Sequence, residues 1–391
     1  MDLAVAFEYG LAFLTIFVTV FFLLVLLENR GELNRRLALP RRLPLVSIII
    51  PAFNEEESIE ATIESALAAD YPRKQIIVVD DGSTDGTLRI ARRFARCGVL
   101  VLHQPNRGKG AALNLGLGHA RGELVATLDS DSFLEKDSLR KMLPFFSNPR
   151  VGAVTSVMKV HEPRTPLQRL QRLEYLVTVF NRRLLSFINA INVTPGPLSM
   201  FRRKVFDKVG RYDERNILED QEMALRIQAA DYEIASSMDA VVYTRVPSTL
   251  QQLTRQRVRW HRGGIRNMLK HYYLVNPRYG DFGLFVMPLG IFSVFALFAV
   301  FAVAISALLS GSPFLQYGLD AVFYSLTPLH FLSAIIFVGT VGWAYVGVKS
   351  IEGEGVNPVE LMAYVLLYAP LITLFWVVTV FKELKREKLR W

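Results

Sequence analysis

The chain has 391 residues, of which 51% are hydrophobic, and it carries a net charge of +9 at neutral pH. This length allows one sizeable domain together with membrane helices, and the hydrophobic content is high for a purely soluble protein. The single cysteine, Cys97, excludes a disulfide within the chain and a cysteine-based zinc site. The basic residues crowd the membrane-proximal segments, so we expect attraction to anionic lipid headgroups and no binding of nucleic acid.

The first predicted element is a transmembrane helix over residues 1–29. Residues 4–27 are almost continuously apolar, which is long enough to cross about 30 Å of hydrocarbon. Asp2 and Glu8 stand where a signal peptide would carry basic residues, and no small-residue cleavage site follows. The arginines after this helix predict a cytoplasmic middle region in a multi-pass protein of the plasma membrane; they are Arg30, Arg35, Arg36, Arg41 and Arg42.

Residues 44–248 are predicted to form the cytoplasmic domain. Short β-branched runs alternate there with helical patterns, with strands expected at 46–50, 76–79, 99–102 and 124–128 and helices at 55–69, 84–96 and 108–120. This alternation predicts an α/β fold with a parallel sheet. From residue 150 the pattern is mixed, and a long helix is expected over 165–189 before the Pro195-Gly196-Pro197 turn.

A basic amphipathic helix is expected after the domain, in the segment 249–278. Its helical pattern covers residues 250–274, and such a helix favours the membrane interface over a transmembrane position. Gly263 and Gly264 stand inside this pattern. Because each glycine costs about 1 kcal/mol in a helix interior, we predict a break at this pair.

The C-terminal region, residues 279–391, is predicted to be transmembrane. Apolar stretches at 282–309, 321–348 and 359–381 are each long enough to span a bilayer. Together with the first helix they place the C-terminus outside the cell, whereas its basic tail favours the cytoplasm; the tail residues are Lys382, Lys385, Arg386, Lys388 and Arg390. An interfacial or re-entrant position of one stretch would remove this conflict.

Polar residues follow the ends of three predicted strands, and they are Asn54 and Glu55, Asp80 and Asp81, and Asp129 and Asp131. Ligands of open α/β sheets bind beyond the carboxyl ends of the strands, so we expect these pairs to converge on one edge. Taken singly, an Asp-Gly turn or a helix cap would explain each motif. The carboxylates of Asp129 and Asp131 are hard oxygen ligands that suit Mg²⁺ or Mn²⁺ held together with substrate phosphates.

Lys109 stands between two glycines at a predicted helix start. Backbone N–H groups at such an end, together with the ammonium group, can bind a phosphate. A solvated lysine in a turn is the alternative. The segment lacks the G-K-[ST] of a P-loop, and the later glycines lack the dinucleotide spacing, so a nicotinamide enzyme is not expected.

Two further motifs lie beyond residue 215. Glu219 and Asp220 open a helical pattern, where acidic residues are also favoured simply by the helix dipole. Gln256, Arg259 and Trp260 are spaced i, i+3 and i+4, so they share one helix face. Guanidinium suits bidentate contacts with phosphate, and an indole can stack on a sugar ring. A tryptophan that marks the lipid headgroup layer is the alternative reading of Trp260.

Together these residues resemble the membrane-embedded, processive family-2 glycosyltransferases, such as cellulose, hyaluronan, chitin-oligosaccharide and poly-N-acetylglucosamine synthases. The Q-x-x-R-W motif is the specific part, because nonprocessive relatives generally lack it. The similar segments are VSIIIPAFNEE (46–56), VVDDGSTDGT (78–87), Asp129-Ser130-Asp131, TPGPLSMFRR (194–203) and Gln256 to Trp260. The T-E-D of the family is replaced by Leu218-Glu219-Asp220, and the hydrophobic region is small for the family, which puts a complete single-chain secretion channel in question.

The resemblance implies a GT-A domain and an inverting transfer of a hexose or N-acetylhexosamine from a UDP-sugar to a growing β-linked polysaccharide. It implies Asp220 as the catalytic base beside Glu219, Asp129 and Asp131 as ligands of Mg²⁺ or Mn²⁺, and Gly196, Pro197 and Trp260 on the acceptor. The residues implied to bind the nucleotide sugar are Asn54, Glu55, Asp80, Asp81, Lys109, Asp129, Gln256, Arg259 and Trp260. The implied partners are the UDP-sugar, a polysaccharide or lipid-linked acceptor, the lipid bilayer, and an accessory protein or second copy for secretion.

Two alternatives remain open at this point. A non-processive enzyme that moves one sugar onto a polyprenyl phosphate or another lipid would share the fold and the metal, and product sizing separates it from a polymerase. A transporter or channel with a nucleotide-sensing domain is the other. Charged residues are sparse in the C-terminal apolar stretches, where Asp320 and His330 are the main candidates, so an ion or solute pathway has little support.

Overall fold

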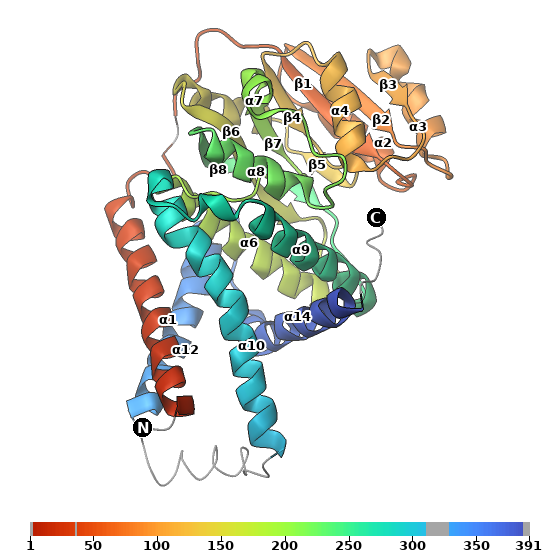
Figure 1. Ribbon diagram of the computed structural model, residues 1–391. Coiled ribbons are helices and arrows are strands. Elements are labelled where there is room, and N and C mark those ends of the chain that lie inside the picture. Colours follow the sequence, from red (N-terminus) through yellow and green to blue (C-terminus); the bar gives the residue numbers. More distant parts are fainter. Residues whose placement is uncertain (1–2, 36, 310–327, 386–391) are drawn as a thin grey trace.

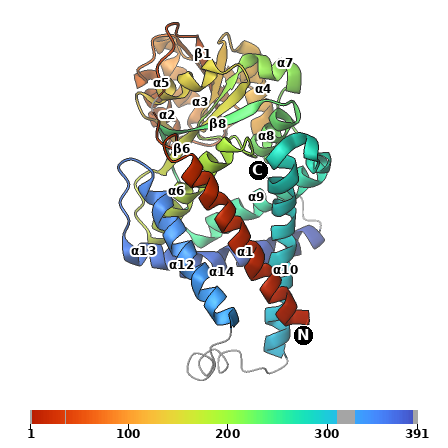
Figure 2. The same ribbon diagram turned by 90° about the vertical axis from the view of Figure 1, so that its left-hand side faces the viewer.

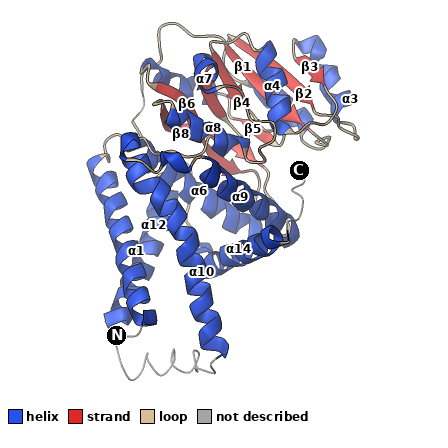
Figure 3. Cartoon of the chain, in the orientation of Figure 1, coloured by secondary structure: helices blue, strands red, loops and turns tan. Residues whose placement is uncertain are grey.

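The structure is a computed structural model that describes residues 3–35, 37–309 and 328–385. Within these residues, eight strands form one sheet in the order β3-β2-β1-β4-β7-β6-β8-β5 (Figures 1 and 3). The neighbours β3, β2, β1 and β4 are mutually parallel, as the sequence predicts, whereas β7 is antiparallel to β4 and β6. The strands are β1 (Val46–Ala52), β2 (Lys74–Asp80), β3 (Leu100–His103), β4 (Leu124–Thr127), β5 (Ser132–Leu134), β6 (Val151–Val160), β7 (Ser199–Arg202) and β8 (Glu233–Thr244).

Helices bury both faces of the parallel part of the sheet. Every residue of β1 is buried. Ile48 and Ile50 pack in one apolar cluster with α2, while Ile49 packs in a second cluster with α4. Burial on both faces explains why this strand is a continuous apolar run. The helices of the domain are α2 (Ile59–Ala68), α3 (Thr87–Arg93), α4 (Lys109–His119), α5 (Ser138–Met142), α7 (Arg203–Val209) and α8 (Glu219–Ala229).

Two longer helices, α6 (Pro166–Phe187) and α9 (Leu250–Lys270), lie between the sheet and the apolar helices (Figure 1). Each begins at a threonine whose hydroxyl accepts a hydrogen bond from a backbone N–H three residues later. At α6 the side chain of Gln168 also accepts from the backbone N–H of Thr165, at 3.1 Å, which completes a capping box. The T-x-x-Q pattern therefore specifies where α6 starts.

The predicted break at Gly263 and Gly264 is wrong, because α9 continues unbroken from Leu250 to Lys270. The glycines allow a close helix contact instead. A Cβ on Gly263 would lie 2.6 Å from the Cβ of Leu218, whereas a Cβ on Gly264 would meet nothing nearer than 3.8 Å. The packing of α9 against the residue before α8 therefore outweighs the low helix propensity of this pair.

This difference predicts opposite effects of two neighbouring substitutions. Gly263→Ala is expected to lower the free energy of unfolding by about 1–3 kcal/mol, the usual cost of overpacking. Gly264→Ala is its matched control, and it is expected to stabilise the chain by up to about 1 kcal/mol through helix propensity. Thermal unfolding of the purified variants measures both, and equal effects of the two substitutions would contradict the close contact.

The apolar helices extend away from the domain (Figures 1 and 2). By length and composition alone, the described segments Ala6–Glu28, Pro328–Lys349 and Pro358–Leu384 could each cross a membrane. The expected stretch 321–348 is helical from Pro328, and residues 321–327 lie outside the described part. These helices are α1 (Leu3–Glu28), α10 (Met287–Leu309), α12 (Pro328–Lys349), α13 (Pro358–Ala363) and α14 (Ala369–Leu384), with a π-helical turn at Tyr364–Tyr368 between the last two.

The last of these helices, α14, runs across the direction of α1, α10 and α12 in both views (Figures 1 and 2). It is attached to the amphipathic helix α9. Glu383 accepts hydrogen bonds from Arg262 and Arg266, and the rings of His261 and Trp376 stack with their centroids 4.1 Å apart. The C-terminal half of α14 is thus held against α9.

Candidate functional site

The loops at the carboxyl ends of β1, β2 and β4 border one cavity of about 220 Å³. Parallel strands bring these loops to the same edge, although the residues are far apart in the sequence. Each of the three predicted strand-end pairs contributes to its lining, together with Lys109 and Arg259, whereas Glu219 and Asp220 do not; the strand-end residues are Glu55, Asp81, Asp129 and Asp131. At least one member of each strand-end pair therefore reaches the cavity, whereas Asn54 and Asp80 do not line it.

Asp80 and Asp81 are 0% and 3% exposed, and both hold neighbouring loops in place. Asp80 accepts from the backbone N–H of Ser83 and contacts Nδ1 of His103 at 2.7 Å. Asp81 accepts from the backbone N–H groups of Arg107 and Gly108, at 3.0 and 2.8 Å. Asp81 thus shapes the turn that leads into α4, and Oδ1 of Asp80 is a buried acceptor without a partner in the described residues.

Asn54 and Glu55 connect the loop after β1 with the loop after β2. Asn54 has φ = 54°, and its side-chain oxygen accepts from the backbone N–H of Thr84 at 2.8 Å. The carboxylate of Glu55 accepts from the hydroxyl of Ser58 at 2.6 Å and lines the cavity. Burial raises the pKa of Glu55, and the charge of Asp129 adds to this effect. Glu55 is therefore part of the carboxylate cluster, whereas the side chain of Asn54 orders a loop.

Lys109, the first residue of α4, joins two carboxylates. Its ammonium lies 2.7 Å from Oδ1 of Asp129 and 3.0 Å from Oε1 of Glu219. Burial would lower the pKa of Lys109, but these carboxylates and Asp220 outweigh burial and raise it. A Cβ on Gly196 would lie 2.5 Å from this ammonium and from Oδ2 of Asp129. The Pro195-Gly196-Pro197 turn therefore lies directly against the lysine–aspartate pair.

Asp129 and Asp131 lie on the loop between β4 and β5. Burial raises the pKa of Asp131 to about 7, with further contributions from the charges of Asp129 and Glu55. No three side chains of the usual ligand types converge on a metal position among the residues that the structure describes. A clustered pair of carboxylates nevertheless fits Mg²⁺ or Mn²⁺, since such ions are commonly held by one or two carboxylates together with substrate phosphates.

Glu219 and Asp220 begin α8, and they differ in their surroundings. Glu219 is 5% exposed and pairs with Lys109. Asp220 accepts from the backbone N–H of Gln221 at 2.7 Å, and its own carbonyl accepts from the hydroxyl of Thr194 at 2.8 Å. Burial, followed by the charge of Glu219, raises the pKa of Asp220 to about 7. Asp220 therefore has the properties of a proton acceptor near neutral pH.

The residues of the Q-x-x-R-W motif take different positions on α9. Arg259 lines the cavity with the carboxylates. Trp260 is half-buried against the larger apolar cluster, with the guanidinium of Arg257 at 4.2 Å from its ring centroid. Oε1 of Gln256 is buried without a hydrogen-bond partner in the described part of the chain. Of the three, the structure places Arg259 at the cavity.

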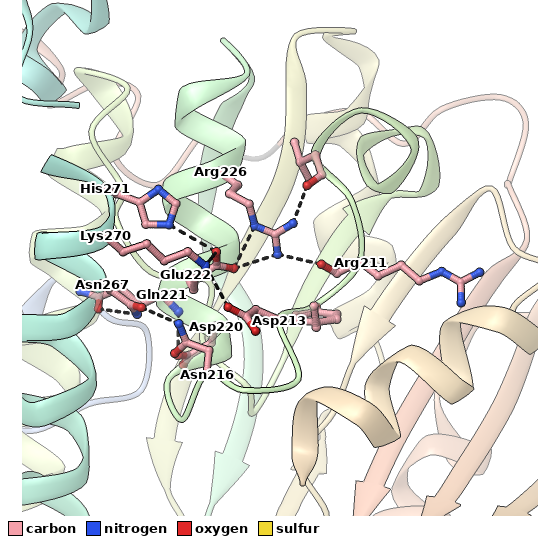
Figure 4. A network of polar contacts seen from close by, with 12 residues as sticks. Arg211, Asp213, Asn216, Asp220, Gln221, Glu222, Arg226, Asn267, Lys270 and His271 are labelled. Atoms are coloured by element: carbon pink, nitrogen blue, oxygen red, sulfur yellow. Dashed lines mark hydrogen bonds and ion pairs between the residues drawn. The ribbon is translucent and has the colours of Figure 1, made fainter. Parts of the chain in front are cut away.

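A buried ionic network that the sequence analysis missed connects α8 to α9 (Figure 4). Glu222 is 1% exposed and accepts from Arg226 and Lys270, at 2.9 and 2.8 Å, while Nε2 of His271 lies at 3.3 Å. Burial would raise the pKa of Glu222, but these hydrogen bonds outweigh it and lower the pKa to about 2. The network holds α8, which carries Asp220 in its first turn, against α9, which carries Arg259. Its only local signal in the sequence is the i, i+4 spacing of Glu222 and Arg226, which form an ion pair on α8.

Comparison with known proteins identifies the family of the domain that contains this site. Residues 47–210 match the model of the glycosyl transferase family 2. The poly-β-1,6-N-acetyl-D-glucosamine synthase of Staphylococcus epidermidis is 33% identical over 232 residues, which cover 58% of this chain and 56% of that protein. The enzyme of the same name from Staphylococcus aureus (strain COL) is 31% identical over the same shares. The chain thus matches just over half the length of these curated relatives.

The fold is also similar to that of a solved mannosyltransferase from Pyrobaculum calidifontis, a structure in complex with GDP-Man and Mn²⁺. The TM-score is 0.57 at 20% identity, and the match covers 98% of this chain and 100% of the other. The family match therefore applies to residues 47–210, and the fold of the chain is of GT-A type. The predicted resemblance and fold class are both confirmed.

Proposed function

We propose that the chain is an inverting, metal-dependent glycosyltransferase that extends a β-linked polysaccharide at the membrane from a UDP-sugar. The observation that carries the proposal is the cavity in which Asp129, Asp131, Lys109 and Arg259 meet. Carboxylates for a divalent ion and two cations for a diphosphate are the groups that transfer from a nucleotide sugar requires. The names of the relatives make UDP-N-acetylglucosamine the first donor to test.

The donor would occupy the edge of the sheet. A bound Mg²⁺ or Mn²⁺, held by Asp129 and Asp131, would neutralise charge on the diphosphate. The loops ordered by Asn54, Asp80 and Asp81 would surround the base and ribose, with Glu55 beside them. Lys109 and Arg259 would offset the charge that develops on the leaving UDP, because fixed cations stabilise charge that appears in the transition state.

The acceptor would approach from the side of the Pro195-Gly196-Pro197 turn and α9. Asp220 would accept the proton of the attacking hydroxyl, which requires its carboxylate form. Gln256, with its unsatisfied oxygen, and Trp260 would contact the sugars. Attack from the face opposite the leaving UDP would convert an α-linked donor into a β-linked product. Glu219 would act through Lys109, with which it pairs.

The arrangement of the helices supports a cytoplasmic domain. With α1, α10 and α12 as spans and α14 in the interface, the domain and the basic tail would lie on the same side of the membrane. This topology satisfies the positive-inside rule at both ends of the chain. Within the described residues, α1, α10 and α12 would provide little wall for a polymer channel, so secretion would involve an accessory protein or a second copy.

Release of UDP tests the proposed reaction. The purified chain in detergent is expected to release UDP from UDP-N-acetylglucosamine with Mn²⁺ or Mg²⁺ and to form a ladder of oligomers by mass spectrometry. Excess EDTA is expected to abolish release, since the carboxylate cluster would then repel the diphosphate, and added Mn²⁺ should restore it. Undiminished turnover in EDTA would eliminate the metal, and a single glycolipid product would favour transfer of one sugar to a lipid acceptor.

A further inference from the structure

Arg257, the residue after Gln256 in the Q-x-x-R-W motif, makes buried contacts that the proposed reaction does not use. It is 4% exposed, and its Nη2 donates to the carboxylate of Glu174 on α6 and, at 3.2 Å, to the phenolic oxygen of Tyr368. The hydroxyl of Tyr368 in turn donates to Oε2 of Glu174 at 2.7 Å. Side chains from α6, α9 and the π-helical turn Tyr364–Tyr368 therefore form a closed group, which we call the Glu174–Arg257–Tyr368 triad.

The triad joins α9 to the C-terminal apolar segment. Tyr368 is 1% exposed and packs in one apolar cluster with Leu253 of α9 and Phe375 of α14. A buried ion pair generally adds little net stability compared with apolar side chains of similar volume, because the cost of desolvation offsets the attraction. Stability alone therefore gives a poor account of an arginine at this position, and its remaining contact becomes informative.

That remaining contact is the indole of Trp260, three residues further along α9. Cζ of Arg257 lies 4.2 Å from the centroid of the ring, well within the range of about 6 Å in which an aromatic face attracts a cation. Residues at i and i+3 are neighbours on a helix surface, so both side chains lie on the same part of α9. Nε of Arg257 is buried without a hydrogen-bond partner in the described residues. The contacts that fix the guanidinium are therefore the triad and the indole.

Arg257 and Arg259 have different surroundings, although only one residue separates them. Residues at i and i+2 do not share a helix face. Arg259 lines the cavity with the carboxylates, whereas Arg257 and Trp260 do not. The indole of Trp260 is half-buried and packs against the larger apolar cluster. A change in the triad should therefore act on the indole and leave the donor cavity intact.

We propose that Arg257 is a positioning residue for the acceptor: the triad holds its guanidinium against the indole of Trp260 and thereby fixes the orientation in which the ring meets an acceptor sugar. The inference rests on the proposed function, in which Trp260 contacts the acceptor. It adds one condition to that function. Acceptor binding depends on how Tyr368 of the C-terminal apolar segment packs against α9, whereas donor binding does not.

The test measures acceptor and donor binding separately. Full-length protein in detergent is titrated with UDP and, in the presence of saturating UDP and Mn²⁺, with a β-1,6-linked N-acetylglucosamine tetramer, the linkage named in the relatives. The double variant Glu174→Gln/Arg257→Met leaves no buried charge unpaired, and its amide can still accept from Tyr368. It is expected to weaken tetramer binding about 5- to 30-fold, the range for a desolvated cation–π contact, and to leave UDP affinity within about twofold. Arg255→Met, at an exposed position of the same helix, is the matched control and should change neither affinity by more than about twofold.

A double-mutant cycle distinguishes the positioning of Trp260 from a general structural role. In a Trp260→Ala background the loss of the triad should have no further effect on tetramer binding, because the indole that it orients is gone. Tyr368→Phe removes only a hydroxyl and keeps the test decisive if the double variant does not fold; it should weaken tetramer binding about 2- to 10-fold in the wild type and not in Trp260→Ala. Equal losses in the two backgrounds, parallel losses of tetramer and UDP binding, or unchanged tetramer binding without the triad would each overturn the proposal.

The same measurements distinguish this inference from the proposed function. If Trp260→Ala weakens tetramer binding but the triad variants do not, the positioning role of Arg257 alone fails. If the tetramer binds through Trp260 and the triad but no UDP-sugar is turned over, the proposed reaction fails and the positioning role stands. If Trp260→Ala leaves tetramer binding unchanged, Trp260 does not contact the acceptor and both assignments fail.

Discussion

Replacing Asp220 by Asn is expected to reduce sugar transfer by about 10²- to 10⁴-fold, the usual contribution of a positioned general base. The amide keeps the oxygen that accepts from the N–H of Gln221, so the start of α8 should be preserved. It cannot take a proton from the attacking hydroxyl. Because Asp220 is not among the residues that line the donor cavity, the affinity for UDP should change little. Initial rates of transfer and titration with UDP measure the two quantities separately.

The pH dependence of the wild-type enzyme supplies the second readout. Burial and Glu219 raise the pKa of Asp220 to about 7. The base acts when it is deprotonated, so kcat/KM should rise with pH up to about 7 and then level off, with about a tenfold fall for each unit below. Asp213→Asn is the matched control, because Asp213 lies on the same network as a partner of Lys270 (Figure 4). Full activity in Asp220→Asn, or an equal loss in Asp213→Asn, would remove Asp220 as the base.

Replacing Lys109 by Met is expected to have the second large effect, a fall in kcat of about 10²- to 10³-fold, as when one fixed charge or donor is removed from a transition state. The ammonium is the common partner of Asp129 and Glu219, at 2.7 and 3.0 Å. Without it, neighbouring carboxylates repel one another and the donor diphosphate loses a cation. Steady-state kinetics with UDP-N-acetylglucosamine and Mn²⁺ measure the loss.

A shift in the pH profile distinguishes this electrostatic effect from simple misfolding. Lys109 lowers the pKa of Asp220, so its removal should raise that pKa and move the rising limb of the profile to higher pH. Lys136, which is exposed on the loop before α5, provides the control Lys136→Met, and its profile should match that of the wild type. An unshifted profile in Lys109→Met would show that the lysine is not coupled to the base.

The parallel half of the sheet could be predicted because its strands are short, fully buried runs separated by helical patterns. The carboxyl ends of β1, β2 and β4 necessarily meet at one edge, so Glu55, Asp81 and Asp129 could be assigned to one site without a structure. The i, i+3 and i+4 spacing of the Q-x-x-R-W motif predicted that its residues share one helix face. The sequence could not show that Arg259 is the member that reaches the cavity.

Contacts between distant segments were not predictable in the same way. Glu222 and Lys270 are both ordinary charged helix residues until folding places them 2.8 Å apart. The glycine pair in α9 predicted a break because helix propensity is local, whereas the contact of Gly263 with Leu218 joins residues 45 positions apart.

The sequence by itself determined the class of protein, the strands whose ends contribute residues to the site, and the presence of apolar helices long enough to cross a membrane, because periodicity and short motifs encode local structure. Only the tertiary structure decided that α14 lies across the other apolar helices and that Lys109 is shared between Asp129 and Glu219. Hydropathy measures how favourably a segment is buried in an apolar medium, but it does not give the orientation of that segment relative to its neighbouring helices. Whether a buried charge is satisfied depends on which distant groups the fold brings within hydrogen-bond distance.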